Sequence, residues 1–207
     1  MKPFYYGFTL VNINLWIWSS VFHTRDKPWT EKMDYFSAGL GSMYGLWYTV
    51  VRLYHLYLQP RLLVHNTPSR RRLLAPWTSL CILLYLAHVT YLCLLPRFDY
   101  GWNMKVNLII GMLYNSLWIS YSLPSPPFQR FWRVPNAIRP SFVLYPAMIA
   151  ISMICAVSLE IFDFPPWWRI IDAHSLWHLA TVPIVWNWYR FLLKDSLDPS
   201  WRDRLIT

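Results

Sequence analysis

Three histidines have the residue type and the spacing that a zinc-dependent hydrolase requires. His174 and His178 are four residues apart, so on a helix their imidazoles would share one face, with Cβ atoms about 5–6 Å apart. His23 comes from a distant part of the chain and would supply a third ligand. Three protein ligands and one position left for water are typical of a catalytic Zn²⁺ site. A histidine pair at this spacing also occurs by chance, so the prediction depends on where His23 lies in the fold.

Two further side chains have the chemistry of a general base and of an oxyanion donor. The pair lacks the glutamate of the H-E-x-x-H protease helix, so the base must come from elsewhere, and Asp34 is the natural candidate to take a proton from water. An acid at this position is also favoured simply as a charge near the start of a helix. Ser19 is one helical turn before His23 and could polarise a substrate carbonyl. Its other interpretation is a hydrogen bond back to the carbonyl four residues earlier.

Two more polar residues stand close to this set. His88 lies inside an apolar stretch, where a hydrogen bond between helices is favoured over a contact with the metal ligands. Asp172 precedes His174 by two residues, and we interpret it as a helix cap or as a hydrogen-bond acceptor for an imidazole.

The composition is that of a membrane protein. Of the 207 residues, 56% are hydrophobic and 14% are charged, whereas a soluble domain has about 25% charged residues. The chain also has 14 Trp and 14 Tyr, side chains that gather at the two membrane–water boundaries. The net charge of +9 could indicate nucleic-acid binding. The basic residues lie between apolar stretches, however, as in the cytosolic loops of membrane proteins, so we expect membrane lipids as partners and no nucleic acid.

Six apolar segments are long enough to cross a membrane, which takes about 20 residues. The sequence therefore predicts a single transmembrane domain over residues 1–207, all-α, built as a six-span helical bundle. Gly39, Gly41 and Gly45 are spaced as small residues that let helices approach closely, and Gly111 is expected to do the same. The predicted spans are residues 4–22, 33–54, 76–95, 103–123, 141–161 and 170–193.

The basic residues predict which face of the membrane each connection lies on. If every predicted span crosses once, one face holds 13 of the 19 Lys and Arg residues and the other holds 6. Positive residues stay in the cytosol, so the face with six is lumenal or external. That face carries His23, Asp34, His174 and His178, which brings all four to the same side by parity alone.

Three segments resemble the Per1-like family, the post-GPI-attachment phospholipases. They are WSSVFHTRDKPWTEKMDYF (18–36), RFDYGWN (97–103) and DFPPWWRIIDAHSLWHLATVP (163–183), and the resemblance extends over nearly the whole chain. The family belongs to a wider superfamily of seven-span hydrolases that includes alkaline ceramidases and adiponectin-receptor-like proteins. The superfamily pattern is a serine four residues before a first histidine, then an aspartate, then a late H-x-x-x-H pair. The resemblance implies Zn²⁺ at His23, His174 and His178, with Asp34 and Ser19 assisting catalysis.

The resemblance also implies a function and a location. Family members remove the sn-2 fatty acid from the lipid of GPI-anchored proteins, in the endoplasmic reticulum of fungi and in the Golgi of animals. We therefore expect zinc-dependent ester hydrolysis at the lumenal face of the endoplasmic reticulum membrane, with the Golgi membrane as the alternative. Members carry a signal peptide and an additional first span, so we expect this chain to be a seven-span hydrolase fold without its first span.

Two other functions stay open at this point. The first is an amidase acting on ceramide, as in the alkaline ceramidases, because the same metal chemistry cleaves amides. The second is a non-catalytic membrane protein with structural zinc, or a truncated inactive form. A structural zinc has four protein ligands, and His88 is the plausible fourth.

Overall fold

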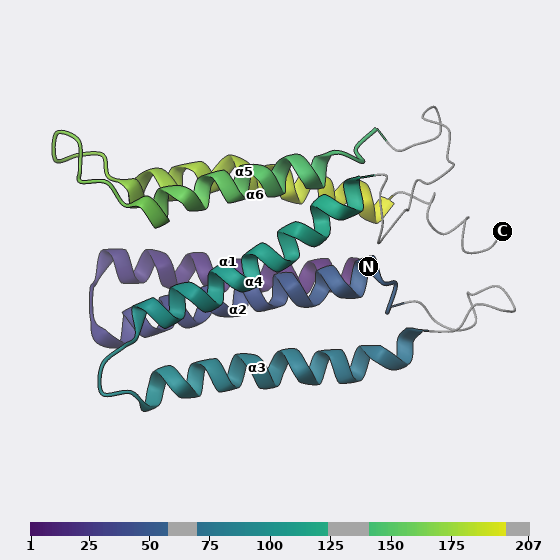
Figure 1. Ribbon diagram of the computed structural model, residues 1–207, viewed down its shortest axis with the longest axis horizontal. Coiled ribbons are helices and arrows are strands. Elements are labelled where there is room, and N and C mark those ends of the chain that lie inside the picture. Colours follow the sequence, from purple (N-terminus) through teal and green to yellow (C-terminus); the bar gives the residue numbers. More distant parts are fainter. Residues whose placement is uncertain (58–69, 124–140, 198–207) are drawn as a thin grey trace, which may run out of the picture. The chain divides into compact units, whose positions relative to one another are not determined.

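The computed structural model describes residues 1–57, 70–123 and 141–197, and every long regular element in these residues is an α-helix (Figure 1). The predicted all-α class is therefore confirmed. Each of the six apolar segments contains one helix, and the helix ends lie within a few residues of the predicted ones. The helices are α1 (Lys2–Thr24), α2 (Pro28–Leu53), α3 (Leu74–Leu94), α4 (Tyr100–Ser122), α5 (Tyr145–Phe162) and α6 (Ala173–Leu197).

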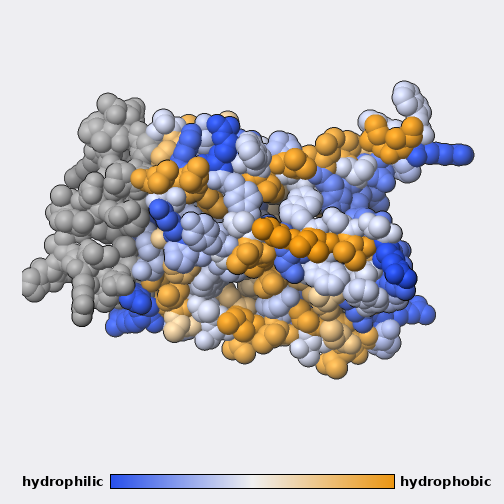
Figure 2. Space-filling view, turned by 180° about the vertical axis from the view of Figure 1, so that it is seen from behind, coloured by the Kyte–Doolittle hydropathy of each residue, from blue (hydrophilic) through white to orange (hydrophobic). Residues whose placement is uncertain are grey.

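Two of these helical segments are long and apolar enough to cross a membrane, Arg71–Leu94 and Tyr145–Phe162. Only 17% and 22% of their apolar windows are buried inside the protein, so most of their side chains face outward, as lipid-contacting helices do. Figure 2 shows that hydrophobic side chains form several patches on one face of the described residues. The chain is an all-α membrane protein. For the other four helices of the described part, membrane crossing stays a prediction, because their many Tyr, Trp and Gly residues keep the mean hydropathy low.

The turn between α1 and α2 is fastened by Thr30, which is fully buried. Its hydroxyl accepts a hydrogen bond from the backbone N–H of Lys27 (3.0 Å) and lies 2.8 Å from the carbonyl oxygen of Arg25, to which it donates. These bonds tie two residues of the connection, Arg25 and Lys27, to the first turn of α2. As a result the last turn of α1, with His23, and the first two turns of α2, with Asp34, lie at the same end of this helical hairpin.

The described residues form two compact units that divide within α4 after Tyr114. In the first unit α1 and α2 lie side by side (Figure 1), and the hydroxyl of Tyr44 donates to the carbonyl of Phe4 at 3.0 Å. The indole N–H of Trp47 on α2 donates to the hydroxyl of Thr78 on α3 at 3.0 Å. These polar contacts flank an apolar core, so the helices are held at specific rotations. The buried members of that core are Met43, Cys81 and Ile110.

The glycines of α2 lie where other helices come close. Gly39, Gly41 and Gly45 are all buried, and a Cβ added to Gly41 would be 3.0 Å from a methyl group of Leu15 on α1. The predicted close approach is confirmed at Gly41, whereas a Cβ at Gly39 or Gly45 would make ordinary contacts, at 3.8 and 3.6 Å from the rings of Tyr85 and Tyr114. The same prediction for Gly111 is wrong, because a Cβ there would meet nothing within 4 Å. That face of α4 has no described neighbour near enough to require a small residue.

The second unit packs the end of α4 against the antiparallel pair α5 and α6. The indole of Trp118 on α4 is fully buried and makes edge-on contacts with the rings of Trp188 and Phe191 on α6, at centroid distances of 5.2 and 5.3 Å. The hydroxyl of Ser122 accepts a hydrogen bond from the backbone N–H of Ala147 at 3.2 Å, near the start of α5. Helix α4 thus contacts both α5 and α6. Because α5 and α6 pack against each other in opposite directions, the end of α5 lies beside the start of α6.

Candidate metal centre

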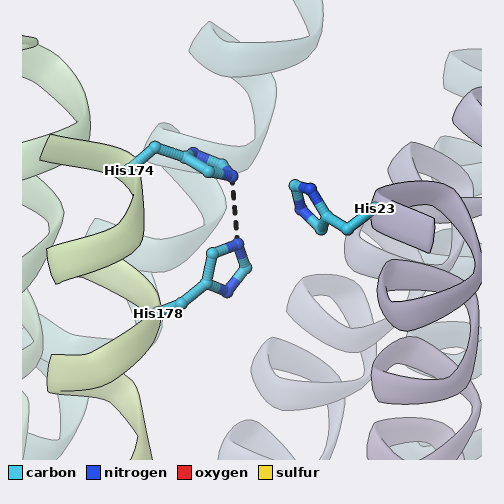
Figure 3. A group of neighbouring side chains, drawn as sticks. All are labelled: His23, His174 and His178. Carbon is cyan, nitrogen blue, oxygen red and sulfur yellow. Dashed lines mark hydrogen bonds between the residues drawn. The ribbon is translucent and has the colours of Figure 1, made fainter. Parts of the chain in front are cut away.

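The two histidines of α6 face each other. Helix α6 begins at Ala173, so His174 is in its first turn and His178 follows one turn later. Their Nε2 atoms are 3.0 Å apart, the ring centroids are 4.6 Å apart and the ring planes are nearly perpendicular, at 84° (Figure 3). The predicted placement of both imidazoles on one helix face is therefore confirmed.

The separation of the two nitrogens fits a shared metal ion. Two imidazole nitrogens bound to one zinc at about 2.0–2.1 Å with tetrahedral angles would be about 3.3 Å apart. The Nε2 atoms of His174 and His178 are 3.0 Å apart, so a small rotation of either ring would bring both to ligand distance of one ion. The donor set is also suitable, because neutral imidazole is a common ligand of Zn²⁺.

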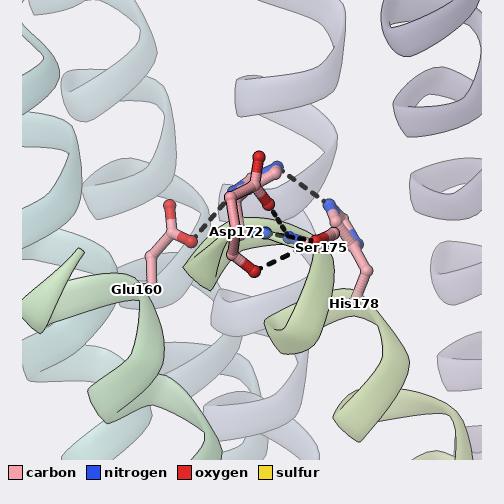
Figure 4. Close-up of polar contacts among 5 residues, drawn as sticks. Glu160, Asp172, Ser175 and His178 are labelled. Atoms are coloured by element: carbon pink, nitrogen blue, oxygen red, sulfur yellow. Dashed lines mark hydrogen bonds and ion pairs between the residues drawn. The ribbon is translucent and has the colours of Figure 1, made fainter. Parts of the chain in front are cut away.

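The other ring nitrogen of His174 is held by a carboxylate. The Nδ1 atom of His174 lies 2.9 Å from Oε2 of Glu160 (Figure 4). Glu160 is in the last turn of α5, which ends at Phe162. A carboxylate here requires a proton on Nδ1, which leaves the lone pair of His174 on Nε2, the nitrogen that faces His178. Metal-binding histidines commonly have such a carboxylate behind them.

Glu160 is a site residue that the sequence pattern of histidines, aspartate and serine does not predict. One signal could have found it: it is the sole charged residue in the predicted span 141–161. An ionisable residue within an apolar span usually has a function or a specific partner. Its partner, His174, could not be identified from spacing because the two residues are on different helices.

Asp172 caps α6. Its carboxylate accepts a hydrogen bond from the backbone N–H of Ser175 at 2.7 Å, and the Ser175 hydroxyl accepts one from the backbone N–H of Asp172 at 3.2 Å (Figure 4). The hydrogen bonds from Ser175, first that of its side chain, hold the pKa of Asp172 below its usual value. Of the two interpretations of Asp172, the helix cap is therefore confirmed, and the carboxylate that contacts an imidazole is Glu160 instead.

In the first unit, the three remaining candidates are at one end of the hairpin of α1 and α2. His23 is exposed in the last turn of α1. Ser19, one turn earlier, is buried, at 6% exposure, while its neighbour Ser20 is exposed. Asp34 is partly buried in the second turn of α2, and its backbone carbonyl accepts a hydrogen bond from the hydroxyl of Ser37 at 2.9 Å. Ser19 thus faces the protein interior and not the lipid.

His88 is occupied by a contact between helices. Its Nε2 atom is 3.2 Å from Oδ1 of Asn103 on α4, and both side chains are buried. Asn103 in turn accepts a hydrogen bond through its backbone carbonyl from the side chain of Asn107 at 3.0 Å. The favoured interpretation of His88, a hydrogen bond between helices, is confirmed. This contact uses Nε2 of His88 and leaves its Nδ1 atom without a hydrogen-bond partner among the described residues.

The three candidate ligands come from both units, His174 and His178 from the second and His23 from the first. The sequence pattern of the Per1-like family matches residues 1–196. This chain belongs to the Per1-like family. The match runs through both units and includes every residue of the candidate site.

Individual relatives share about a third of the residues. The chain is 39% identical over 188 residues to "Protein PER1 homolog" of Schizosaccharomyces pombe, covering 91% of this chain and 51% of that protein. It is 35% identical over 200 residues to "GPI-specific phospholipase A2-like PGAP3" of Mus musculus (95% and 55% covered) and 34% identical over 199 residues to the Homo sapiens protein of that name (95% and 55%). The chain thus spans about half the length of the curated relatives it matches. No solved structure matches it.

Proposed function

We propose that this chain hydrolyses the sn-2 acyl ester of the lipid that anchors GPI-linked proteins, and so takes part in GPI-anchor remodelling. The observation that carries the proposal is the arrangement of Glu160, His174 and His178. The Nε2 atoms of the two histidines are 3.0 Å apart, and Nδ1 of His174 is 2.9 Å from the carboxylate of Glu160. Membership of the Per1-like family supports the choice of substrate, since several relatives are named GPI-specific phospholipase A2-like.

The proposed metal ligands are Nε2 of His174, Nε2 of His178 and a ring nitrogen of His23. If each helix crosses the membrane once, the end of α1 and the start of α6 face the same side, which supports the addition of His23 to the pair. The resemblance of residues 18–36 to the family pattern supports it independently. When bound, Zn²⁺ would polarise the ester carbonyl and lower the pKa of water at its open position.

The remaining steps are assigned to this chain's own groups. The carboxylate of Asp34 takes the proton of the attacking water, whose oxygen bonds to the acyl carbon. The hydroxyl of Ser19 donates a hydrogen bond to the carbonyl oxygen, where negative charge develops. The bond from the acyl carbon to the sn-2 oxygen then breaks, and the proton held by Asp34 passes to that oxygen. The products are a free fatty acid and a lyso-lipid still attached to the protein.

The proposed location is the endoplasmic reticulum membrane, with the site on the lumenal face and the Golgi membrane as the alternative. The unequal division of Lys and Arg, 13 against 6 of 19, supports this orientation. A lumenal site is also where GPI-linked proteins are displayed. The outward-facing apolar surfaces of α3 and α5 would keep the acyl chain within the bilayer while the headgroup stays in water.

The test is to express the chain in cells that lack their own GPI-remodelling lipase and to analyse the lipid on a GPI-anchored reporter. Because the chain spans about half the length of its relatives, a version joined to the remaining region of a relative is run in parallel. The expected product is a reporter anchor without its sn-2 chain. A well-expressed protein that leaves the anchor intact and lowers cellular ceramide would make the chain an amidase. Unchanged lipids with zinc still bound would favour a non-catalytic protein.

A further inference from the structure

We infer that Glu160 is the positioning residue that makes His174 a metal ligand, and that it thereby sets the affinity of the site for Zn²⁺. The inference rests on the proposed function to the extent that His174 binds the metal. It adds a residue that lies outside the histidine, aspartate and serine pattern from which the site was predicted.

The contact itself is direct and joins two helices. Oε2 of Glu160 is 2.9 Å from Nδ1 of His174, a normal distance for a hydrogen bond to a carboxylate. Glu160 is on α5 and His174 opens α6, 14 residues later. The antiparallel packing of these two helices is therefore what delivers the carboxylate to the back of the imidazole, on the side opposite His178.

The position of Glu160 is unfavourable for the helix that carries it. A carboxylate in the last turn of a helix opposes the helix dipole, whose negative end lies there. Helix α5 is also one of the two segments apolar enough to cross a membrane, and an ionised side chain near the end of such a segment is costly unless it has a partner. The residue at 160 therefore weakens α5 locally. Within the part of the chain that the structure describes, the contact of its side chain with His174 offsets this cost.

The contact also selects one tautomer of His174. A neutral imidazole carries its proton on either nitrogen, and only the nitrogen without the proton can bind a metal. With Nδ1–H donated to Glu160, the lone pair is on Nε2, which is 3.0 Å from Nε2 of His178. Without Glu160 the ring would lose the acceptor that fixes this tautomer and could carry its proton on Nε2. Both changes would weaken binding at the position shared with His178.

A purely structural role explains less. The side chains of His174 and Glu160 are 46% and 26% exposed. Even with a protonated imidazole, an ion pair between groups this accessible would contribute little to stability. Fastening α5 to α6 would also not require the imidazole to face a second histidine.

The experiment measures zinc affinity on the purified full chain in lipid nanodiscs, by competition with a chromophoric chelator. Glu160→Ala is expected to weaken Zn²⁺ binding about 10–100-fold, the usual effect of losing a carboxylate behind a ligating histidine. Glu160→Gln keeps a hydrogen-bond acceptor for Nδ1 and is expected to lose less. The matched control is Asp172→Asn, which removes a nearby acid that contacts Ser175 and not an imidazole. It is expected to bind zinc as the wild type does.

Two further measurements separate the possible outcomes. The melting temperature in excess chelator reports stability without metal, and Co²⁺ absorption reports the ligand geometry. Equal zinc affinity in Glu160→Ala and Asp172→Asn, with a lower metal-free melting temperature in Glu160→Ala, would overturn the inference and make the contact a helix fastener. A wild-type chain that binds no zinc would instead overturn the metal site of the proposed function. If Glu160→Ala does not fold, the comparison of Glu160→Gln with Asp172→Asn decides.

Discussion

His88 on α3 and Asn103 on α4 share a hydrogen bond, Nε2 to Oδ1 at 3.2 Å, between two buried side chains. Replacing either residue by Ala is expected to destabilise the first unit, because the other is left with a buried polar group. A double-mutant cycle should give a coupling energy of about 0.6 kcal/mol and no more than about 1.7 kcal/mol, the range for such bonds in membranes. The measurement is reversible unfolding of His88→Ala, Asn103→Ala and the double variant.

The same variants test whether His88 is a metal ligand. The proposed ligand set is His23, His174 and His178, and His88 is assigned to the contact with Asn103. His88→Ala should therefore retain the zinc content of the wild type. Loss of zinc in His88→Ala, with zinc retained in Asn103→Ala, would show that His88 closes a four-ligand site. That result would favour the structural-zinc alternative over a hydrolase.

Gly7 is expected to tolerate no larger side chain. A Cβ at this position would overlap the hydroxyl oxygen of Tyr44 and lie 3.0 Å from its ring carbon Cζ, and that hydroxyl is already held by the carbonyl of Phe4. Gly7→Ala should therefore destabilise the pairing of α1 with α2 by about 1–3 kcal/mol, as other overpacked sites do. The matched control is Gly111→Ala, where a Cβ meets nothing within 4 Å. A control as unstable as Gly7→Ala would contradict the steric explanation.

The helices could be predicted from the sequence, and the partner of His174 could not. Apolar segments of about 20 residues form helices whatever their neighbours are, because the membrane leaves the backbone no other hydrogen-bond partners. The spacing of His174 and His178 is likewise local, so one helix is enough to bring their rings together. The contact of Glu160 with His174 depends instead on how α5 and α6 are rotated against each other, and no short pattern in the sequence encodes that rotation.

Asp172 illustrates the same limit. From the sequence it was equally suited to cap α6 and to accept a hydrogen bond from an imidazole. The cap depends on Ser175, three residues later, and uses only backbone geometry near the helix start. The alternative needed knowledge of which acid reaches His174. The cap is a local interaction and could be predicted from the sequence. Which acid contacts His174, Asp172 or Glu160, could be seen only in the packed structure.

The orientation of the chain can be tested with single cysteines. In a background without Cys81, Cys93 and Cys155, a cysteine at Asp26 should be protected from a membrane-impermeant thiol reagent in sealed microsomes. A cysteine at Arg71 should react without permeabilisation, because the face with more Lys and Arg is expected to be cytosolic. Reaction at Asp26 in sealed vesicles would reverse the topology and move the proposed site to the cytosol.

Metal content tests the ligand set. The purified chain should hold about one zinc, and His23→Ala, His174→Ala or His178→Ala should each lose most of it, since three protein ligands are the usual minimum for a catalytic site. Atomic absorption after gel filtration provides the measurement. Zinc retained by His23→Ala and lost by the other two variants would leave the pair of α6 as a metal site and remove His23 from it.

The role of Asp34 is separable from metal binding, which makes it the sharpest test of the proposed chemistry. Asp34→Asn should keep the zinc of the wild type, because Asp34 is assigned to proton transfer and not to ligation. It should nevertheless reduce release of the sn-2 fatty acid by about 10²–10⁴-fold, the usual contribution of a general base. Asp26→Asn is the matched control, since Asp26 is an exposed acid on the connection between α1 and α2 and should retain full activity. Ser19→Ala should also keep its zinc and slow the reaction, because its hydroxyl is assigned to the developing negative charge. Normal turnover in Asp34→Asn, in a preparation where His174→Ala is inactive, would remove Asp34 from the mechanism while leaving the metal site in place.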